Sequence, residues 1–335
     1  MTEHRRNGAP TLEDVAQSAG VSRALVSLVM RQSPRVSAQA RQRVLAAAAD
    51  LGYRPNLMAR NLAARSTMTI GLLLNDLHNP WFADVADGVH SAAEASEYQL
   101  ILASGRRTNL VESRALDTFL ASRVDGIIVA GCRLVTSRII EVAIEVPLVS
   151  VGRVIRTKRV GSVTTDDALG ARLAVDHLVG LGHSRIVHID GGKGAGAAPR
   201  RAGYKQAMRA HGLEEHAQVI PGDFTEEAGA NGVQRLMRAR TLPTAIFTAN
   251  DLSAVGAIDQ IERNGLRVPG DISVVGFDNT SLAALNHIGL TTIDQPRVQM
   301  GSTAAQMLIA AINGRGKLAD CVMTPQLVVR QTSDR

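Results

Sequence analysis

The sequence has few aromatic residues, two cysteines and no long apolar run. Aromatic residues make up 3% of the chain, so each one is informative about packing or binding. Cys132 and Cys321 lie far apart without metal-ligand spacing around them, which predicts reduced thiols rather than a disulfide framework or a zinc site. No segment approaches the roughly 20 apolar residues that span a bilayer. The start, MTEHRRNGAP, lacks the apolar run of a signal peptide, so we expect a cytoplasmic protein without a membrane segment.

Lysine is absent from the first 66 residues, although arginine is abundant there. Met1 to Ser66 contain ten arginines against four acidic residues, a net charge of +6 that equals the formal charge of the whole chain. The remaining residues therefore sum to about zero. Basic charge confined to one segment predicts a polyanion-binding head on a neutral body, and the alternative is a solvated basic face.

The segment from Thr11 to Met30 has the pattern of two short helices joined by a tight turn. The Thr11 hydroxyl can cap the first helix, with Asp14 three residues later as in a capping box. Gly20 permits the positive φ of a sharp turn, and Ser22 can cap the second helix. The outward face of that helix then starts with Arg23, Ala24 and Ser27. This pattern predicts a helix-turn-helix whose second helix enters the DNA major groove.

A third helix is expected to begin at Ser37 and to stop near Gly52. Three helices are the smallest unit that gives a helix-turn-helix a core of its own. The segment LMARNLAA follows Asn56 and is too short to be a stable helix alone. We therefore expect it to become helical only against a partner.

From Met68 onward, short β-branched runs alternate with amphipathic segments. The predicted strands are TIGLLLN, QLILAS, DGIIVA, PLVSV, GSVTT, RIVHID, TAIFTA, ISVVGF and LTTID. Helices are expected from Trp81 to Glu97 and near 166–181, 199–212, 225–239 and 251–264. Strands that are apolar on both faces and alternate with helices indicate parallel sheets covered on both sides. Two such sets in series predict two similar lobes with a ligand cleft between them.

Two other classes of protein fit these features less well. GGKGAG follows a predicted strand but lacks the GxGxxG and GxxxxGK[ST] spacing of nucleotide sites, which argues against an enzyme. His177, His183 and His188 are close in sequence, yet no HExxH occurs, so they are expected to be structural and no metal or cofactor is predicted. A secreted sugar-binding protein for transport is disfavoured by the basic head and the lack of a signal peptide.

Several motifs in one collinear order resemble the lactose-repressor (LacI/GalR) family of bacterial transcription regulators. They are TLEDVAQSAGVS, VLAAAADLGYRPN, NPWF, TTDDALGARLAVDHLVGLGH, PTAIFTANDLSAVGA and GLRVPGDISVVGFDN, within residues 11–332. The resemblance implies an α/β fold with a three-helix head and a two-lobed, periplasmic-binding-protein-like body with parallel sheets. The expected boundaries are 1–55 for the head, 56–67 for a hinge helix and linker, and 68–335 for the effector-binding and dimerisation domain. The first lobe would span about 68–165 and 296–323, and the second about 166–295 and 324–335.

The same resemblance implies a function. Two recognition helices related by a two-fold axis require inverted half-sites, so the family implies a homodimer on a near-palindromic operator. It also implies a repressor controlled by a small molecule, a sugar or related polyol, bound between the lobes. No enzymatic activity and no cofactor are expected.

Residue by residue, the resemblance assigns DNA contact to Thr11, Ser22, Arg23, Ala24, Ser27, Asn56, Ala59 and Leu62. Arg23 and Ala24 match base-reading positions, and an arginine can pair bidentately with guanine. Leu62 matches a leucine that is wedged between base pairs of the minor groove. The alternatives are a phosphate contact for Arg23 and core packing for Leu62. Leu28 stands where the family usually has arginine, which removes one base contact.

The resemblance also assigns effector contact to Asn79, Trp81, Phe82, Arg153, Arg200, Phe224, Asn250, Asp278 and Gln295. Aromatic faces suit the C–H faces of a sugar, while the polar groups suit its hydroxyls. The alternative for each aromatic residue is ordinary core packing. Gly152 departs from sugar-binding members of the family, which often have Asp before this arginine.

Overall fold

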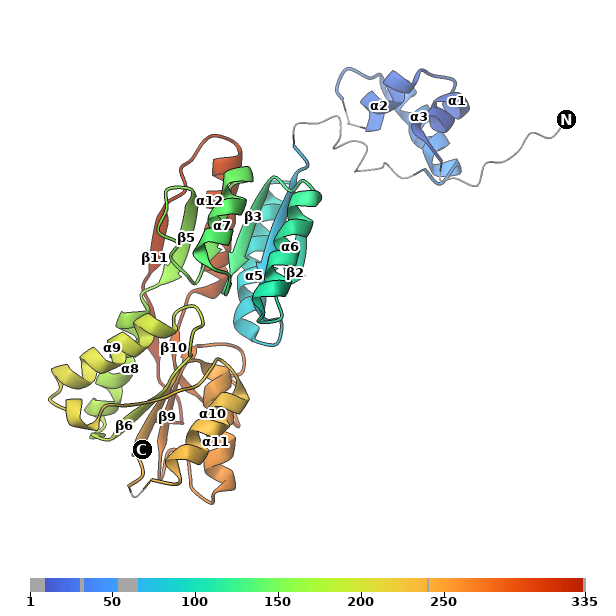
Figure 1. Ribbon diagram of the computed structural model, residues 1–335. Coiled ribbons are helices and arrows are strands. Elements are labelled where there is room, and N and C mark those ends of the chain that lie inside the picture. Colours follow the sequence, from blue (N-terminus) through green and yellow to red (C-terminus); the bar gives the residue numbers. More distant parts are fainter. Residues whose placement is uncertain (1–9, 31–32, 54–65, 240, 334–335) are drawn as a thin grey trace. The chain divides into compact units, whose positions relative to one another are not determined.

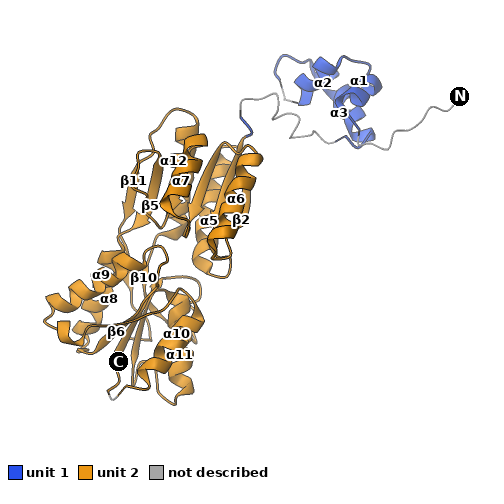
Figure 2. Cartoon of the chain, viewed as in Figure 1, with its two compact units in different colours: residues 1–67 blue, residues 68–335 orange. Residues whose placement is uncertain are grey.

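The computed structural model describes residues 10–30, 33–53, 66–239 and 241–333. The chain divides after Thr67 into an N-terminal unit, here called the head, and a C-terminal unit from Met68 to Arg335, the body (Figure 2). Among the described residues, no helix is both long enough and apolar enough to cross a membrane.

The described part of the head contains the helices α1 (Leu12–Ala19), α2 (Arg23–Met30) and α3 (Ala38–Asp50). The predicted capping box is confirmed, because Thr11 N and Oγ1 each donate to Asp14 Oδ2 at 2.7 Å and Asp14 N donates to Thr11 Oγ1. Gly20 ends α1 with φ of 64°, which a residue with a side chain adopts at a cost. Local sequence therefore determines the turn that separates α1 from α2.

A small core holds the three helices together. Val15, Val26 and Val44, one from each helix, are fully buried against one another. Arg43 of α3 donates to the carbonyl oxygens of Ala19 and Gly20, at 2.8 and 3.2 Å, and so satisfies the end of α1. The orientation of α2 is thereby fixed by packing on one side and by a hydrogen-bonded turn on the other.

The first lobe of the body is a parallel sheet with the strand order β11-β5-β4-β3-β1-β2 (Figure 1). Its strands are β1 (Thr69–Leu74), β2 (Gln99–Ser104), β3 (Gly126–Ala130), β4 (Leu148–Val151), β5 (Val160–Thr165) and β11 (Asp320–Met323). Helices α5 (Pro80–Ala95) and α12 (Arg297–Ile312) pack on one face, and α6 (Asn109–Ala121) and α7 (Thr136–Glu145) on the other.

The second lobe repeats this arrangement with the order β12-β10-β9-β8-β6-β7, in which only the β10–β12 pair is antiparallel. Its strands are β6 (Ile186–Ile189), β7 (Gln218–Ile220), β8 (Ala245–Thr248), β9 (Ser273–Asp278), β10 (Thr291–Asp294) and β12 (Gln326–Val328). Helices α8 (Asp167–Gly180) and α9 (Ala197–Ala210) cover one face, and α10 (Glu226–Leu236) and α11 (Asp251–Arg263) cover the other.

All nine predicted strands and the five predicted body helices are present, so the α/β fold class is confirmed. The strands that were not predicted are β7, β11 and β12. Each has only three or four residues and is partly exposed, so none shows the continuous apolar run that marks a buried strand.

The chain crosses between the lobes three times: from β5 to α8, from β10 to α12, and from β11 to β12. Arg297, at the start of α12, lies at the second crossing. Its Nε donates to Asp84 of the first lobe at 2.6 Å, and its Nη1 donates to the carbonyl oxygen of Asp278 in the second. A side chain as well as the backbone therefore connects the lobes here.

Glycines allow the helices of the first lobe to touch along their backbones. A Cβ added to Gly88 of α5 would lie 2.0 Å from the carbonyl oxygen of Val298, and one added to Gly301 of α12 would lie 2.0 Å from that of Val85. Gly229 and Gly256 produce the same close approach of α10 and α11 in the second lobe. The spacing of these helix pairs thus depends on missing side chains.

Candidate functional site

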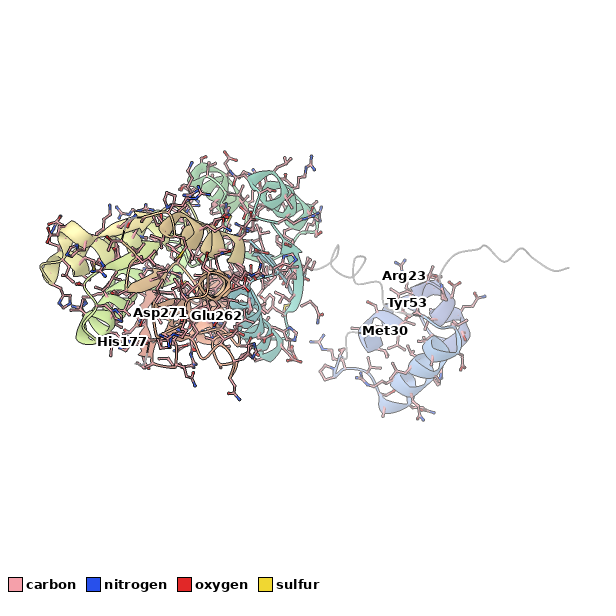
Figure 3. The ribbon with its side chains drawn as sticks, turned by 90° about the horizontal axis from the view of Figure 1, so that it is seen from below. Arg23, Met30, Tyr53, His177, Glu262 and Asp271 are labelled. Carbon is pink, nitrogen blue, oxygen red and sulfur yellow. The ribbon has the colours of Figure 1, made fainter. Side chains whose placement is uncertain are left out.

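The outward surface of the head is formed by the first turns of α2. Val26 and Val29 bury one side of this helix, whereas Arg23 and Ala24 are exposed on the other and Ser27 is half-buried. The labelled Arg23 side chain projects from the head into solvent (Figure 3). A cation and a methyl group are thus presented side by side at the N-terminal end of a rigid helix.

Two of the three hydroxyls predicted to contact DNA in the head, those of Thr11 and Ser22, already have local partners. Ser22 Oγ accepts the amide of Leu25 at 3.2 Å, and Thr11 is engaged by Asp14. Both residues remain exposed, so they can accept a second interaction. Asn56, Ala59 and Leu62 lie outside the described residues.

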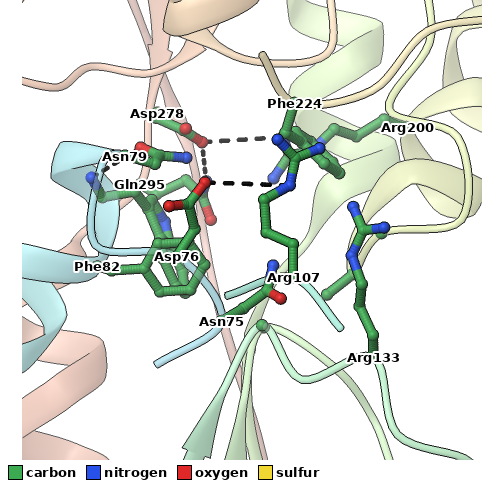
Figure 4. Close-up of a pocket in the computed structure, with 15 residues that line it drawn as sticks. Asn75, Asp76, Asn79, Phe82, Arg107, Arg133, Arg200, Phe224, Asp278 and Gln295 are labelled. Carbon is green, nitrogen blue, oxygen red and sulfur yellow. Dashed lines mark hydrogen bonds and ion pairs between the residues drawn. The ribbon is translucent and has the colours of Figure 1, made fainter. Parts of the chain in front are cut away.

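The body contains a cavity between its two lobes (Figure 4). From the first lobe it is lined by Asn75, Asp76, Asn79, Trp81, Phe82, Arg107, Gly131, Arg133 and Gly152. From the second lobe it is lined by Gly194, Ala195, Arg200, Phe224, Asp278 and Gln295. Most of these residues follow the carboxyl ends of parallel strands, where open α/β sheets bind their ligands.

The structure brings together seven of the nine predicted effector residues: Asn79, Trp81, Phe82, Arg200, Phe224, Asp278 and Gln295. The other two have different positions. Arg153 lines a neighbouring groove, where its guanidinium donates to the carbonyl oxygen of Leu134 at 2.6 Å and to the hydroxyl of Thr136 at 2.9 Å. Asn250 is fully buried, caps α11 by accepting the amide of Ser253 at 3.0 Å, and lies behind Phe224.

A buried arginine organises the second-lobe side of the cavity. The Nε of Arg200 donates to Asp167 at 2.8 Å, and its Nη1 lies 3.8 Å from the carboxylate of Asp278. The guanidinium carbon is 3.6 Å from the ring centre of Phe277 and 5.6 Å from that of Phe224. Ion pairing and cation–π contact hold this side chain in place.

Asp278 is a buried carboxyl group at the end of β9. Burial raises its pKa to about 8, the charge of nearby Asp251 also raises it, and Arg200, Arg297 and Gln295 act in the opposite direction. Gln295 Nε2 donates to Asp278 at 2.6 Å, while Gln295 Oε1 accepts the hydroxyl of Thr165. Burial thus favours the protonated form of this group, which can both donate to and accept from a ligand hydroxyl.

The aromatic wall of the first lobe consists of Trp81 and Phe82, whose rings pack edge to face with centres 4.9 Å apart. Gly152 leaves space beside Trp81, because an added Cβ would contact the indole at 3.4 Å. Within the described chain, Trp81 Nε1 and Asn75 Oδ1 have no hydrogen-bond partner although both residues are over nine-tenths buried. A buried donor and a buried acceptor without partners are suited to a polar ligand group.

Sequence reasoning missed Asn75, Asp76, Arg107 and Arg133, which all line the cavity. Each follows the carboxyl end of a first-lobe strand, so the rule that ligands bind at these ends could have identified them. From the sequence alone, Arg107 and Arg133 look like ordinary basic residues of loops. Their shared partner, Asp223, lies 116 and 90 residues away.

The histidines have separate structural roles. His183 hydrogen-bonds to the hydroxyls of Thr244 and Ser273, both at 3.0 Å. His188 is fully buried with Nδ1 at 3.0 Å from the carbonyl oxygen of Phe247, and His177 contacts Ser333. Across the described ranges, no cluster of three or more His, Cys, Asp or Glu side chains is arranged to hold a metal ion.

Comparison with known proteins gives two family matches that together cover most of the chain. Residues 11–56 match the bacterial regulatory proteins of the lacI family, and residues 175–333 match a periplasmic binding protein-like domain.

Similar proteins match over nearly their whole length. Catabolite control protein A of Priestia megaterium is 33% identical, with 95% of this chain and 97% of that protein covered. The ribose operon repressor of Haemophilus influenzae is 34% identical, with 96% and 98% covered. A crystal structure of the Lac repressor dimer bound to operator and the anti-inducer ONPF superimposes with a TM-score of 0.88, at 31% identity and with 98% and 100% covered.

Proposed function

Because the chain belongs to the lacI family of bacterial regulatory proteins, we propose that it represses transcription by binding a near-palindromic operator as a homodimer under the control of a sugar-like effector. The family expected from the sequence is confirmed, and with it a DNA-binding transcription regulator rather than an enzyme. The partners, the effector class and the residue roles below are our proposals. We place the activity in the cytoplasm, where the DNA is.

The observation that carries the DNA-binding proposal is the exposed start of α2 on a buried helix-turn-helix core. Arg23 is the residue that we propose to read a guanine, through a bidentate pair with O6 and N7. Ala24 offers only a methyl group, which suits thymine. Ser22 and Ser27 position the helix through the phosphate backbone.

Two inverted half-sites require two heads, and the Lac repressor structure named above is a dimer on its operator. We propose the same assembly for this chain. Residues 56–67, with Leu62 as the minor-groove wedge, would join each head to its body. This part of the proposal rests on the sequence, because residues 54–65 are outside the described ranges.

The cavity supports the effector proposal through its chemistry. Aromatic rings line the cavity from both lobes. The amide groups of Asn79 and Gln295 supply donors and acceptors, and Asp278 adds a carboxyl group whose pKa is raised by burial. A polyol needs several such groups at fixed positions. The similar repressor from Haemophilus influenzae is named for the ribose operon, and ribose is a sugar, which is consistent with a sugar-like ligand here.

Control of DNA binding would follow from the lobe arrangement. A ligand that contacts both lobes stabilises the arrangement in which those contacts are best, and it shifts the population toward that state. The coupling is reciprocal, so operator binding must change effector affinity by the same factor. In a dimer, a changed lobe arrangement would change the spacing of the two segments that lead to the heads.

The test uses the full-length protein and selection from random-sequence duplex DNA. We expect an inverted repeat to be enriched, and Arg23→Ala to lose the preference for one base in each half-site at a cost of about 1–3 kcal/mol. Arg267→Ala is the matched control, because Arg267 is an exposed arginine of the body paired with Asp271. The DNA-binding proposal is wrong if no duplex is preferred over competitor DNA. The role of Arg23 is wrong if its variant selects the wild-type motif.

A further inference from the structure

Two arginines of the first lobe meet a single carboxylate of the second lobe at the edge of the cavity. Arg133 Nη2 donates to Asp223 Oδ1 at 2.9 Å, and Arg107 Nη2 donates to Asp223 Oδ2. Arg107 follows β2, Arg133 follows β3 and Asp223 follows β7. Both arginines line the cavity, as Figure 4 shows, and Asp223 is not among its lining residues.

The geometry of these ion pairs resembles that of an anion site. Two guanidinium groups from different strands converge on one carboxylate, which is the geometry that arginine uses for carboxylate and phosphate ligands. The only other carboxylate paired with Arg107 among the described residues is Asp76, whose closest approach is 4.0 Å. The Nε of Arg133 is buried and has no hydrogen-bond partner in the described chain. Donor capacity therefore remains after Asp223 is bound.

The second-lobe side of the cavity is less positive. The guanidinium of Arg200 donates hydrogen bonds to Asp167 and to the carbonyl oxygen of Ala249, and it lies over the ring of Phe277. Asp278 is hydrogen-bonded to Gln295 and suits hydroxyl groups. The first-lobe side of the cavity thus offers two arginines, with Asp76 near Arg107, and aromatic rings, whereas the second-lobe side offers mainly neutral polar and aromatic groups.

We propose that the effector is a sugar derivative with a carboxylate or phosphate group, and that this anion replaces Asp223 against Arg107 and Arg133. The proposal rests on the proposed effector site and narrows its ligand class from polyols to acidic sugars. The sugar ring contacts Trp81, Phe82 and Gln295, while the acid group contacts the two arginines.

A consequence for regulation follows from the same contacts. Asp223 belongs to the second lobe and both arginines to the first, so the ion pairs hold the lobes together at the cavity edge. An anion that takes the arginines releases Asp223 and breaks these interlobe pairs. Binding of the anion and the arrangement of the lobes are therefore coupled through Arg107, Arg133 and Asp223.

The test is titration calorimetry of the full-length protein without DNA, at constant ionic strength. The probes are D-glucose, D-glucuronate, D-glucose 6-phosphate and inorganic phosphate. We expect the acidic probes to bind at least about tenfold more tightly than glucose, as for an added charge-assisted pair. Inorganic phosphate reports on the anion position independently of the sugar, and the two acidic sugars distinguish a carboxylate from a phosphate.

Three variants test whether the affinity for acidic ligands depends on these side chains. Arg133→Gln is expected to reduce acid binding by about tenfold or more, whereas Asp223→Asn, which removes the internal competitor, is expected to strengthen it. Arg138→Gln is the matched control, because Arg138 also pairs with two carboxylates, Asp117 and Glu141, away from the cavity. Thermal unfolding of each variant verifies that it is folded.

The proposal is overturned if none of the acidic probes and phosphate binds saturably, or if glucose binds as well as its acids. It is also overturned if Asp223→Asn weakens acid binding or if Arg133→Gln leaves it unchanged. Because DNA is absent, these outcomes are independent of operator recognition. If the protein prefers no DNA duplex in the selection experiment, the DNA-binding proposal is contradicted, but the proposed anion site is not.

Discussion

At the scale of single residues, Asp278 links the stability of the body to pH. Burial raises the pKa of Asp278 to about 8 and that of Asp251 to about 6. The pKa of an aspartate in an unfolded chain is about 3.9. Between these values the folded state binds more protons than the unfolded state, so the free energy of unfolding falls as pH rises. Buried His188, whose pKa is lowered to about 4, has the opposite effect up to the ordinary histidine pKa of about 6.5. We therefore expect the Tm of the body to decrease from about pH 6.5 to about pH 8.5, measured by calorimetry.

Asp278→Asn is expected to flatten the upper part of this decrease, because the amide does not ionise. Asp117→Asn is the control, since Asp117 is an exposed carboxylate outside the cavity. A pH dependence that is the same in Asp278→Asn and in the wild type would contradict the assignment.

Residue-scale prediction from sequence succeeded where the partner is close along the chain. Asp14 lies three residues from Thr11, so the capping box followed from spacing alone. The pairing of Arg133 with Asp223 joins two lobes, and no local pattern encodes it. Arg153 shows the same limit, because its match to a family position does not specify that its guanidinium turns toward Leu134 and Thr136.

The cap of α1 gives a second prediction at this scale. Thr11→Ala removes the hydroxyl that accepts the amide of Asp14 and donates to its carboxylate. Loss of an N-cap costs about 0.5–2 kcal/mol, which we expect to lower the Tm of the head and leave that of the body unchanged. Thr11→Ser, which retains the hydroxyl, is expected to restore most of the loss.

At the scale of elements, the crossing of α5 and α12 depends on the missing side chain of Gly301. An added Cβ would lie 2.0 Å from the carbonyl oxygen of Val85, so the helices must separate or the backbone must shift. Overpacking of this kind costs about 1–3 kcal/mol. We expect Gly301→Ala to lower the Tm of the body, measured by thermal unfolding followed by circular dichroism.

Gly180→Ala is the control, because its added Cβ would have no described atom within 4 Å apart from its chain neighbours and the adjacent backbone of its own helix, and its φ is not positive. Equal stability of Gly301→Ala and wild type would show that the crossing can relax without cost.

Element prediction was reliable for buried strands and weak for edge strands. β1 and β3 are buried along their whole length and read as apolar runs. β12 pairs only with β10 and has three partly exposed residues, so its existence depends on its neighbour rather than on its own sequence. Register and edge position are tertiary properties, and a single sequence gives little information about them.

At the scale of the whole molecule, the head and the body are separate units, so we expect two transitions in calorimetry of the full-length protein. An effector at 100 times its Kd adds about 2.7 kcal/mol to the state that it binds. It should therefore raise the Tm of the body and leave that of the head unchanged in the absence of DNA. A ligand that moves both transitions equally would indicate that the units do not unfold independently.

The order of the two units, head and then body, could be predicted from the sequence, because the composition changes abruptly at Met68. There the basic segment ends and the strands that alternate with helices begin. The three crossings between lobes were accessible only through the family resemblance. Their geometry depends on sheet order, which places β11 beside β5 although about 155 residues separate them.

The return of α12 and β11 to the first lobe has a consequence for biosynthesis. The first five strands of that lobe leave the ribosome early, as does α5. The second helix on the same face, α12, which packs there through Met300, Ala304 and Leu308, is translated near the end of the chain. Until then the nascent polypeptide exposes apolar sheet surface, which promotes aggregation or chaperone binding. Prematurely terminated products should therefore be insoluble even when they contain the complete sequence of β1 to β5.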